Sequence, residues 1–218
     1  HSPPHTIARG HQPAAVVGVS SVGSVSGGPA GVARDLAVRG ASPGLAVTVP
    51  PVRALPPVTT VLESLEHNKI PYALYDRVRV EPSDESFLDA IAFANSRPFD
   101  AIVAVGGGSV IDTAKAVNLY TTYPPAGFLD YVNPPIGQGL PVPGPLKPLL
   151  AIPTTAGTGS ETTGVTIFDY KKLHAKTGSA SRRPKPTLRS RDPDHTRTMP
   201  PQAAASTGLD NLSHSPQA

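Results

Sequence analysis

Apolar residues follow two alternating patterns along the middle of the chain. From Gly31 onward, short apolar runs alternate with stretches in which apolar residues recur every three or four positions. The first pattern is typical of buried strands and the second of helices with one buried face. The segments, in chain order, are a helix 31–38, a strand 45–49, a helix 58–65, a strand 72–75, a helix 84–95, a strand 101–105 and a strand 149–152. Their alternation predicts an α/β fold with a parallel sheet.

The starts of two of these helices are marked by their composition. Pro56 and Pro57 stand just before the helix 58–65, where proline is well tolerated. Asp84 and Glu85 lie in the first turn of the helix 84–95, where negative charge is favoured by the helix dipole. Both signals strengthen the helix predictions.

The prolines are unevenly distributed and mark segments of irregular structure. The chain has 27 prolines in 218 residues, well above the usual ~5%. We expect residues 1–30 to be low-complexity and mostly disordered, and residues 181–205 to be a basic, proline-rich loop. The connection 121–148 is also proline-rich, with room for one helical turn at 128–132. The α/β domain is therefore expected to span 31–180.

Composition and charge exclude several classes of function. The net charge is +3 and cysteine is absent, which excludes a disulfide framework and thiolate chemistry. No apolar run reaches the ~18 residues of a membrane-spanning helix, so no membrane partner is expected. The basic residues between Arg182 and Arg197 lack interleaved aromatic side chains, which favours a solvated loop over nucleic-acid binding. Because the sequence begins with His1, we expect any targeting segment to precede it.

A glycine-rich segment, GGGSVIDTAKA at 106–116, stands between the strand 101–105 and a helix expected to reach about Tyr120. Its glycines let a ligand approach the backbone, and the first amides of the helix would face an anion. Ser109 and Asp112 have the spacing of a capping box, with Ser109 as N-cap. A tight turn explains such a triplet about as well as a phosphate site does. The segment is therefore a candidate pyrophosphate cradle.

A second loop rich in glycine and hydroxyl groups, IPTTAGTGSETTG at 152–164, follows the strand 149–152. Thr154, Thr155, Thr158 and Ser160 are short hydrogen-bonding side chains suited to phosphate or ribose oxygens. The alternative is an exposed turn. Because both loops follow strands of one parallel sheet, they are expected at the same edge, where such sheets bind dinucleotides.

Near the end of the sequence, Asp210 and His214 are four residues apart. A helix would place both side chains on one face as a ligand pair for a divalent metal. By spacing alone, a chance arrangement is favoured, because Pro216 limits the helix.

Together the two loops resemble those of the iron-containing alcohol dehydrogenase family, which has a GGGS-x-x-D-x-AK loop followed by an IPTTAGTGSE loop. The mitochondrial hydroxyacid-oxoacid transhydrogenase branch is most similar, through four further segments and over about Leu55 to Lys176. The segments are LPPV at 55–58, DRVRVEPSDESFLDAI at 76–91, FLDYV at 128–132 and GSETTGVTIFDY at 159–170.

The resemblance implies a Rossmann-like nucleotide-binding domain and a C-terminal helical metal domain that is largely missing from this sequence. Only the start of that helical domain is expected to be present, at 206–218. It also implies a set of ligand contacts. By this resemblance, the NAD pyrophosphate is held by Gly106, Gly107, Gly108 and Ser109, and the same cofactor site includes Asp112. The nicotinamide side is lined by Thr154, Thr155 and Thr158, and the nucleotide is contacted by Lys176. The metal is bound by Asp210 and His214.

The family reaction is hydride transfer between NAD and an alcohol held by Fe²⁺ or Zn²⁺. In the transhydrogenase branch, 4-hydroxybutyrate and 2-oxoglutarate give succinate semialdehyde and 2-hydroxyglutarate. A mitochondrial location and a small-molecule substrate are implied, and self-association into a homo-oligomer is left open. The alternative is a nucleotide-binding remnant without catalysis.

Three departures from the family pattern limit what the resemblance implies. The position near Val49 and Pro50 lacks the acidic residue that meets the adenosine ribose, so NAD is not favoured over NADP there. The segment 188–191 is too polar for the expected buried strand. Since the rest of the helical domain is absent, the sequence is expected to be a fragment that is inactive alone.

Overall fold

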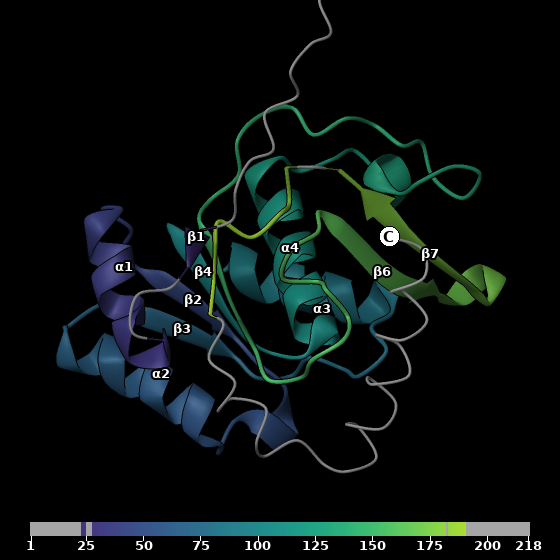
Figure 1. Ribbon diagram of the computed structural model, residues 1–218. Helices are drawn as coiled ribbons and strands as arrows, with labels where there is room; N and C mark the ends of the chain where they lie inside the picture. Colours follow the sequence, from purple (N-terminus) through teal and green to yellow (C-terminus); the bar gives the residue numbers. More distant parts are fainter. Residues whose placement is uncertain (1–22, 25–27, 182, 191–218) are drawn as a thin grey trace, which may run out of the picture.

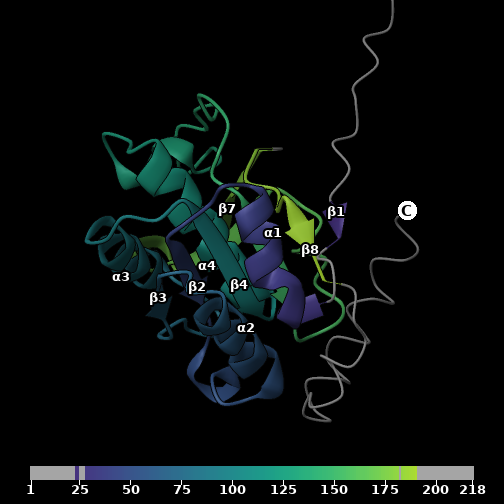
Figure 2. The ribbon, with the colours of Figure 1, turned by 90° about the vertical axis from the view of Figure 1, so that its left-hand side faces the viewer.

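In the computed structural model, the described residues 23–24, 28–181 and 183–190 form a six-stranded sheet, helices on both faces of it, and a separate two-stranded hairpin (Figures 1 and 2). In chain order the elements are β1 (Gly23–Ser24), η1 (Gly28–Gly31), α1 (Val32–Val38), β2 (Gly44–Val47), η2 (Pro50–Val52), α2 (Pro56–His67), β3 (Tyr72–Tyr75), α3 (Asp84–Asn95), β4 (Ala101–Gly106), α4 (Gly108–Thr122), η3 (Phe128–Tyr131), β5 (Leu149–Pro153), β6 (Val165–Tyr170), η4 (Lys171–Leu173), β7 (Ala175–Ala180) and β8 (Leu188–Arg189), the η elements being 3₁₀ turns. No helix among these residues is long and apolar enough to cross a membrane.

The large sheet is entirely parallel, with strand order β1-β8-β5-β4-β2-β3. Strand β4 lies between β2 and β5, and all six of its residues are buried. Its register places Ala101 opposite Gly44 and Ile102 opposite Leu149. The continuous apolar run 101–105 is therefore a central strand, as the sequence predicts.

Alternate residues of β4 belong to two different cores. Ile102 and Ala104 pack with α3 and α4 on one face, while Val103 and Val105 pack with α1 and α2 on the other. This alternation follows from the two-residue period of a strand. Figure 2 shows the sheet between the two helix layers. The α/β prediction is confirmed.

The predicted element boundaries hold closely, with one shortened strand. The helix 84–95 and the strand 72–75 have the predicted ends. Strand β2 ends at Val47 rather than at Val49, because Val49 is the N-cap of the 3₁₀ turn η2. The prolines that follow have no N–H to donate to a neighbouring strand.

The hairpin β6–β7 was not predicted from the sequence. Its strands pair antiparallel, and Thr166 and Phe168 are buried while Val165 and Ile167 are exposed. The Phe168 ring packs against those of Phe87 and Phe128, with centroids 5.3 and 5.5 Å apart. Alternation in 165–170 was the available signal, but its buried face includes a threonine, which weakened the apolar pattern.

The long connection 121–148 packs against the domain. Its predicted helical turn is the 3₁₀ turn η3, whose Tyr131 is buried. The backbone N–H of Asn133 donates to the carbonyl of Gly178 in β7 at 2.9 Å. The hydroxyl of Tyr120 donates to the carbonyl of Phe128 at 2.6 Å, and burial raises the pKa of that hydroxyl above its usual range. The connection therefore joins α4 to the hairpin.

One expectation about the flanks needs correction. Leu188 lies in β8, buried between β5 and β1, although the segment 188–191 was expected not to bury. The backbone N–H groups of Thr187 and Ser190 donate to carbonyls of β5, so sheet hydrogen bonds outweigh the polar composition. Within 1–30, the described residues lie in β1 and in η1. The other residues of 1–30, and residues 182 and 191–205 of the second flank, lie outside the described residues.

Core packing beneath the sheet gives the first prediction. Leu150 in β5 is fully buried, and its replacement in Leu150→Ala should lower the free energy of unfolding by about 2–5 kcal/mol through lost burial and a cavity. The control Leu173→Ala, at a side chain that is 60% exposed, should change it by less than about 0.5 kcal/mol. Urea unfolding followed by circular dichroism measures both. Equal effects would contradict the assigned core.

Candidate functional site

The glycine loop lies where the connections of the sheet change direction. Strand β2 leads to α2 on one face and β4 leads to α4 on the other. In open parallel sheets this divergence leaves a crevice at the carboxyl ends of the strands, where ligands bind. The hydroxyl of Thr48, just after β2, donates to the carbonyl of Val105 at 2.8 Å. That hydrogen bond joins the two strand ends at this point.

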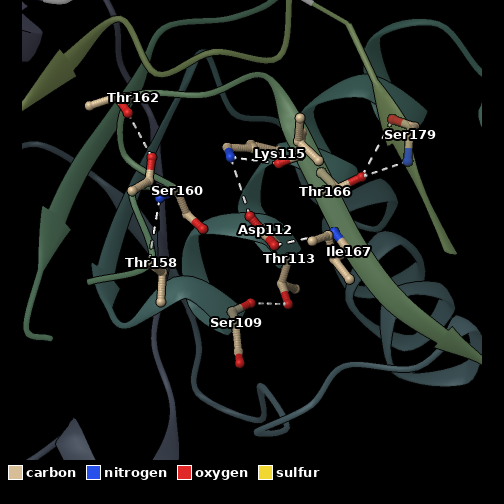
Figure 3. A network of polar contacts seen from close by, with 12 residues as sticks. Ser109, Asp112, Thr113, Lys115, Thr158, Ser160, Thr162, Thr166, Ile167 and Ser179 are labelled. Carbon is tan, nitrogen blue, oxygen red and sulfur yellow. Dashed lines mark hydrogen bonds and ion pairs between the residues drawn. The ribbon is translucent and has the colours of Figure 1, made fainter. Parts of the chain in front are cut away.

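Helix α4 begins at Gly108, with Gly107 as N-cap and no side-chain capping bond. The predicted capping box is therefore wrong. Ser109 is already inside the helix, where its carbonyl accepts from the hydroxyl of Thr113 at 2.7 Å, and Asp112 points into the interior (Figure 3). Because no side chain caps the helix, its first amides can bind an external anion.

The two glycine-containing loops touch each other directly. The backbone N–H of Thr154 donates to the carbonyl of Gly106 at 3.0 Å. A Cβ atom added to Gly107 would lie 2.9 Å from Oγ1 of Thr155, and one added to Gly108 would lie 3.1 Å from Thr158. Contact between the loops is thus one physical reason for glycine at 107 and 108.

A hollow of about 350 Å³ opens beside the start of α4. Its walls come from α4, the loop after β5, the hairpin and the segment that follows β3. The lining residues are Val80, Glu81, Pro82, Gly108, Ser109, Asp112, Thr158, Ser160, Ile167, Phe168, Asp169 and Lys176. A second hollow of about 440 Å³ adjoins it and shares Glu81, Asp169 and Lys176.

The candidate cofactor residues divide into two groups around the first hollow. Gly108, Ser109, Asp112, Thr158 and Lys176 line it. The side chain of Lys176 is 67% exposed, and its Nζ lies 3.6 Å from Oδ1 of Asp169. The members of the second group are in the two loops behind the lining and do not themselves line this hollow: Gly106, Gly107, Thr154 and Thr155.

A buried ion pair lies behind the hollow. Nζ of Lys115 is 3.2 Å from Oδ1 of Asp112, and the lysine side chain has no exposed surface (Figure 3). Burial raises the pKa of the Asp112 carboxyl and lowers the pKa of the Lys115 ammonium, and each partner partly offsets the shift of the other. The sequence motif contains Lys115, but nothing in its pattern distinguished this lysine from a solvated one.

The candidate metal ligands Asp210 and His214 lie outside the described residues. Among the residues that the structure describes, no group of three or more His, Cys, Asp and Glu side chains could hold a metal ion. At the end of β2, where the family pattern has an acidic residue, Val49 is only 9% exposed. A ribose hydroxyl at this point would therefore meet a valine and no carboxylate.

The contact between the loops predicts an energetic coupling. Gly107→Ala should destabilise the fold by about 1–3 kcal/mol, because the new methyl group meets the Thr155 hydroxyl and threonine is stiff at χ1. Adding Thr155→Ala should recover most of that loss. Adding Thr158→Ala instead should give additive effects, since Thr158 contacts Gly108. Thermal unfolding in a double-mutant cycle measures the coupling; equal values for the two threonines would contradict the geometry.

Comparison with known proteins agrees with the loops and the fold. Residues 28–193 match the family described as "Iron-containing alcohol dehydrogenase". The chain is 63% identical over 161 residues to the hydroxyacid-oxoacid transhydrogenase, mitochondrial, of Xenopus tropicalis, covering 74% of this chain and 35% of that protein. It is 55% identical over 183 residues to the human protein of that name, covering 84% and 39%. The chain therefore spans little more than a third of the length of these relatives.

Solved structures show the same fold. A 1,3-propanediol oxidoreductase aligns with a TM-score of 0.77 at 29% identity, covering 85% of this chain and 47% of that one. An iron-containing alcohol dehydrogenase from Thermococcus thioreducens aligns with a TM-score of 0.79 at 27% identity, covering 90% and 51%. On the strength of its two loops, its parallel sheet and these matches, the chain belongs to the iron-containing alcohol dehydrogenase family.

Proposed function

We propose that this chain provides the dinucleotide-binding part of a metal-dependent, NAD-linked alcohol dehydrogenase of the hydroxyacid-oxoacid transhydrogenase type. One observation carries the proposal. The uncapped start of α4 stands at the switch point of the sheet and borders a hollow whose mixed lining includes the first residues of that helix, the hydroxyl of Thr158 and the ammonium of Lys176. This arrangement suits the pyrophosphate of a dinucleotide.

The residues on the two sides of the hollow have complementary roles in cofactor binding. The amides of Gly108 and Ser109 donate to the pyrophosphate, assisted by the helix dipole. The hydroxyl of Thr158 and the ammonium of Lys176 bind further oxygen atoms of the nucleotide from the loop and the hairpin. Gly106, Gly107, Thr154 and Thr155 keep the two loops in contact behind these groups. The volume of about 350 Å³ accommodates part of a dinucleotide.

The rest of the activity requires groups beyond the described residues. A divalent ion, when bound, would act as a Lewis acid towards an alcohol oxygen, and NAD would be the hydride acceptor. The residues that would hold the ion are Asp210 and His214, which lie outside the described residues. The names of the relatives support a hydroxyacid and an oxoacid as substrates, and a mitochondrial location. The family resemblance of the sequence suggests 4-hydroxybutyrate and 2-oxoglutarate as these two substrates.

A second candidate is a nucleotide-binding remnant without catalysis. It is favoured by Val49, a buried apolar residue where the family pattern has an acid that would accept from a ribose hydroxyl. Dehydrogenase activity of the purified chain with added Fe²⁺ or Zn²⁺ would contradict the remnant. NAD binding without turnover would support it.

Calorimetric titration of the full chain with NAD tests the cofactor site. The wild-type chain should bind, and Gly107→Val should abolish binding, because its side chain occupies the space between the two loops. Gly127→Val is the matched control. An added Cβ at Gly127 would be 3.5 Å from the nearest side-chain atom, an ordinary contact outside the hollow, so its affinity should equal that of the wild type.

Thermal unfolding of all three proteins accompanies the titration. Absence of NAD binding by a wild-type chain that melts cooperatively would refute the proposal. Equal losses of affinity in Gly107→Val and Gly127→Val would mean that the first loop has no specific part in binding.

A further inference from the structure

The ammonium of Lys115 is hydrogen-bonded to two partners, and only one of them is a charged group. At 2.8 Å, its shorter contact is with the backbone carbonyl of Val165 in β6, while Asp112 lies at 3.2 Å. The other carboxylate oxygen of Asp112 accepts the backbone N–H of Ile167 at 3.2 Å. The pair on α4 therefore holds two backbone groups of the hairpin. Figure 3 shows the contact between Asp112 and Ile167.

These contacts lie along the edge of β6 that faces away from β7. Residues 165, 167 and 169 present their backbone groups to this edge, since alternate residues of a strand bond to opposite sides. The next position along the edge follows the same pattern, because the N–H of Asp169 donates to the carbonyl of Pro82 at 2.8 Å. Two side chains of α4 thus take the place that a third strand would have.

This edge fixes one wall of the hollow relative to another. Ile167, Phe168, Asp169 and Lys176 line it from the hairpin, whereas Gly108, Ser109 and Asp112 line it from the start of α4. The Asp112–Lys115 pair connects the two walls directly. Lys115 has no exposed surface and is not part of the lining, so any effect of Lys115 on a ligand must pass through the groups it holds.

Stability alone is a weak reason for such a pair. Desolvation raises the pKa of Asp112 and lowers that of Lys115. A raised carboxyl pKa opposes folding as the pH rises above its ordinary value of 3.8, and a lowered ammonium pKa opposes folding as the pH falls below its ordinary value of 10.5. Neutral pH lies between these two values, so both shifts oppose folding there. Buried ion pairs can often be replaced by apolar residues without loss of stability, but apolar residues cannot bond to backbone groups at a defined register.

We propose that Lys115, together with Asp112, is a positioning residue that sets the β6–β7 hairpin against the glycine loop and thereby shapes the cofactor hollow. The inference rests on the proposed NAD binding. It assigns Lys115 no contact with the ligand, and it gives Asp112 a role through the hairpin in addition to its place in the lining.

The test compares Lys115→Met with Asn118→Leu in the full chain. Asn118 is equally buried on α4, but its side chain holds the backbone of Lys147 instead of the hairpin. Both variants should lower the melting temperature. Only Lys115→Met should weaken NAD binding, by roughly tenfold, and speed amide hydrogen exchange in peptides covering 165–170, also by roughly tenfold.

A double variant separates positioning from stability. Asp112→Asn/Lys115→Met removes the uncompensated buried charge, so the fold should regain stability, while Val165 still lacks its donor. Its NAD affinity should therefore stay low. Recovery of affinity together with melting temperature would overturn the proposal, as would unchanged affinity in Lys115→Met.

The exchange measurement keeps this inference distinct from the proposed function. If the wild-type chain binds no NAD, the proposed function fails, and faster exchange at 165–170 in Lys115→Met alone still supports the connection between α4 and the hairpin. Equal exchange in Lys115→Met and Asn118→Leu would overturn that connection, whatever the outcome with NAD.

Discussion

Contact between the β4–α4 turn and the loop after β5 is the constraint on which the site depends. The two strands are neighbours in the parallel sheet, so their following loops must leave the same edge side by side. The Thr154 amide bonds to Gly106, and any side chain at 107 would meet Thr155. Glycine at this turn therefore satisfies the packing of the protein itself as well as any approach by a ligand. The start of α4 is left without a side-chain cap as a consequence.

A second constraint comes from the hairpin, which is not part of the large sheet. The outward edge of β6 carries backbone groups that need partners. Asp112, Lys115 and the carbonyl of Pro82 supply them, and Asn133, which follows η3, bonds to the other strand of the hairpin through Gly178. Two of the residues that hold the hairpin belong to the helix that begins at the glycine loop, so the hairpin and the start of that helix line one hollow.

The family relationship and the structure describe complementary parts of the molecule. The matched region, 28–193, contains the hairpin and every helix and strand of the described residues except β1. Among the described residues that line the hollow, hydroxyls, the first amides of α4 and the ammonium of Lys176 can donate to phosphate oxygens, beside the carboxyl groups of Glu81, Asp112 and Asp169. No group of three or more His, Cys, Asp and Glu side chains in the described part of the chain could hold a metal ion. Because the described part of the chain has groups for a cofactor and no metal-binding group, its sequence motifs point to a cofactor more strongly than to the chemistry performed on a substrate.

The sequence by itself determined the α/β architecture, because buried strands such as 101–105 and one-sided helices such as 84–95 leave local periodic patterns. It also located both loops, since glycine and threonine at strand ends are local signals. Only the tertiary structure decided that Asp112 faces Lys115 and β6 instead of capping the helix, and that the polar segment containing Leu188 completes the sheet. Those outcomes depend on partners that are distant in the chain, 55 residues apart for Asp112 and Ile167 and further apart for Leu188 and Gly23, and spacing along a sequence carries no information about such partners.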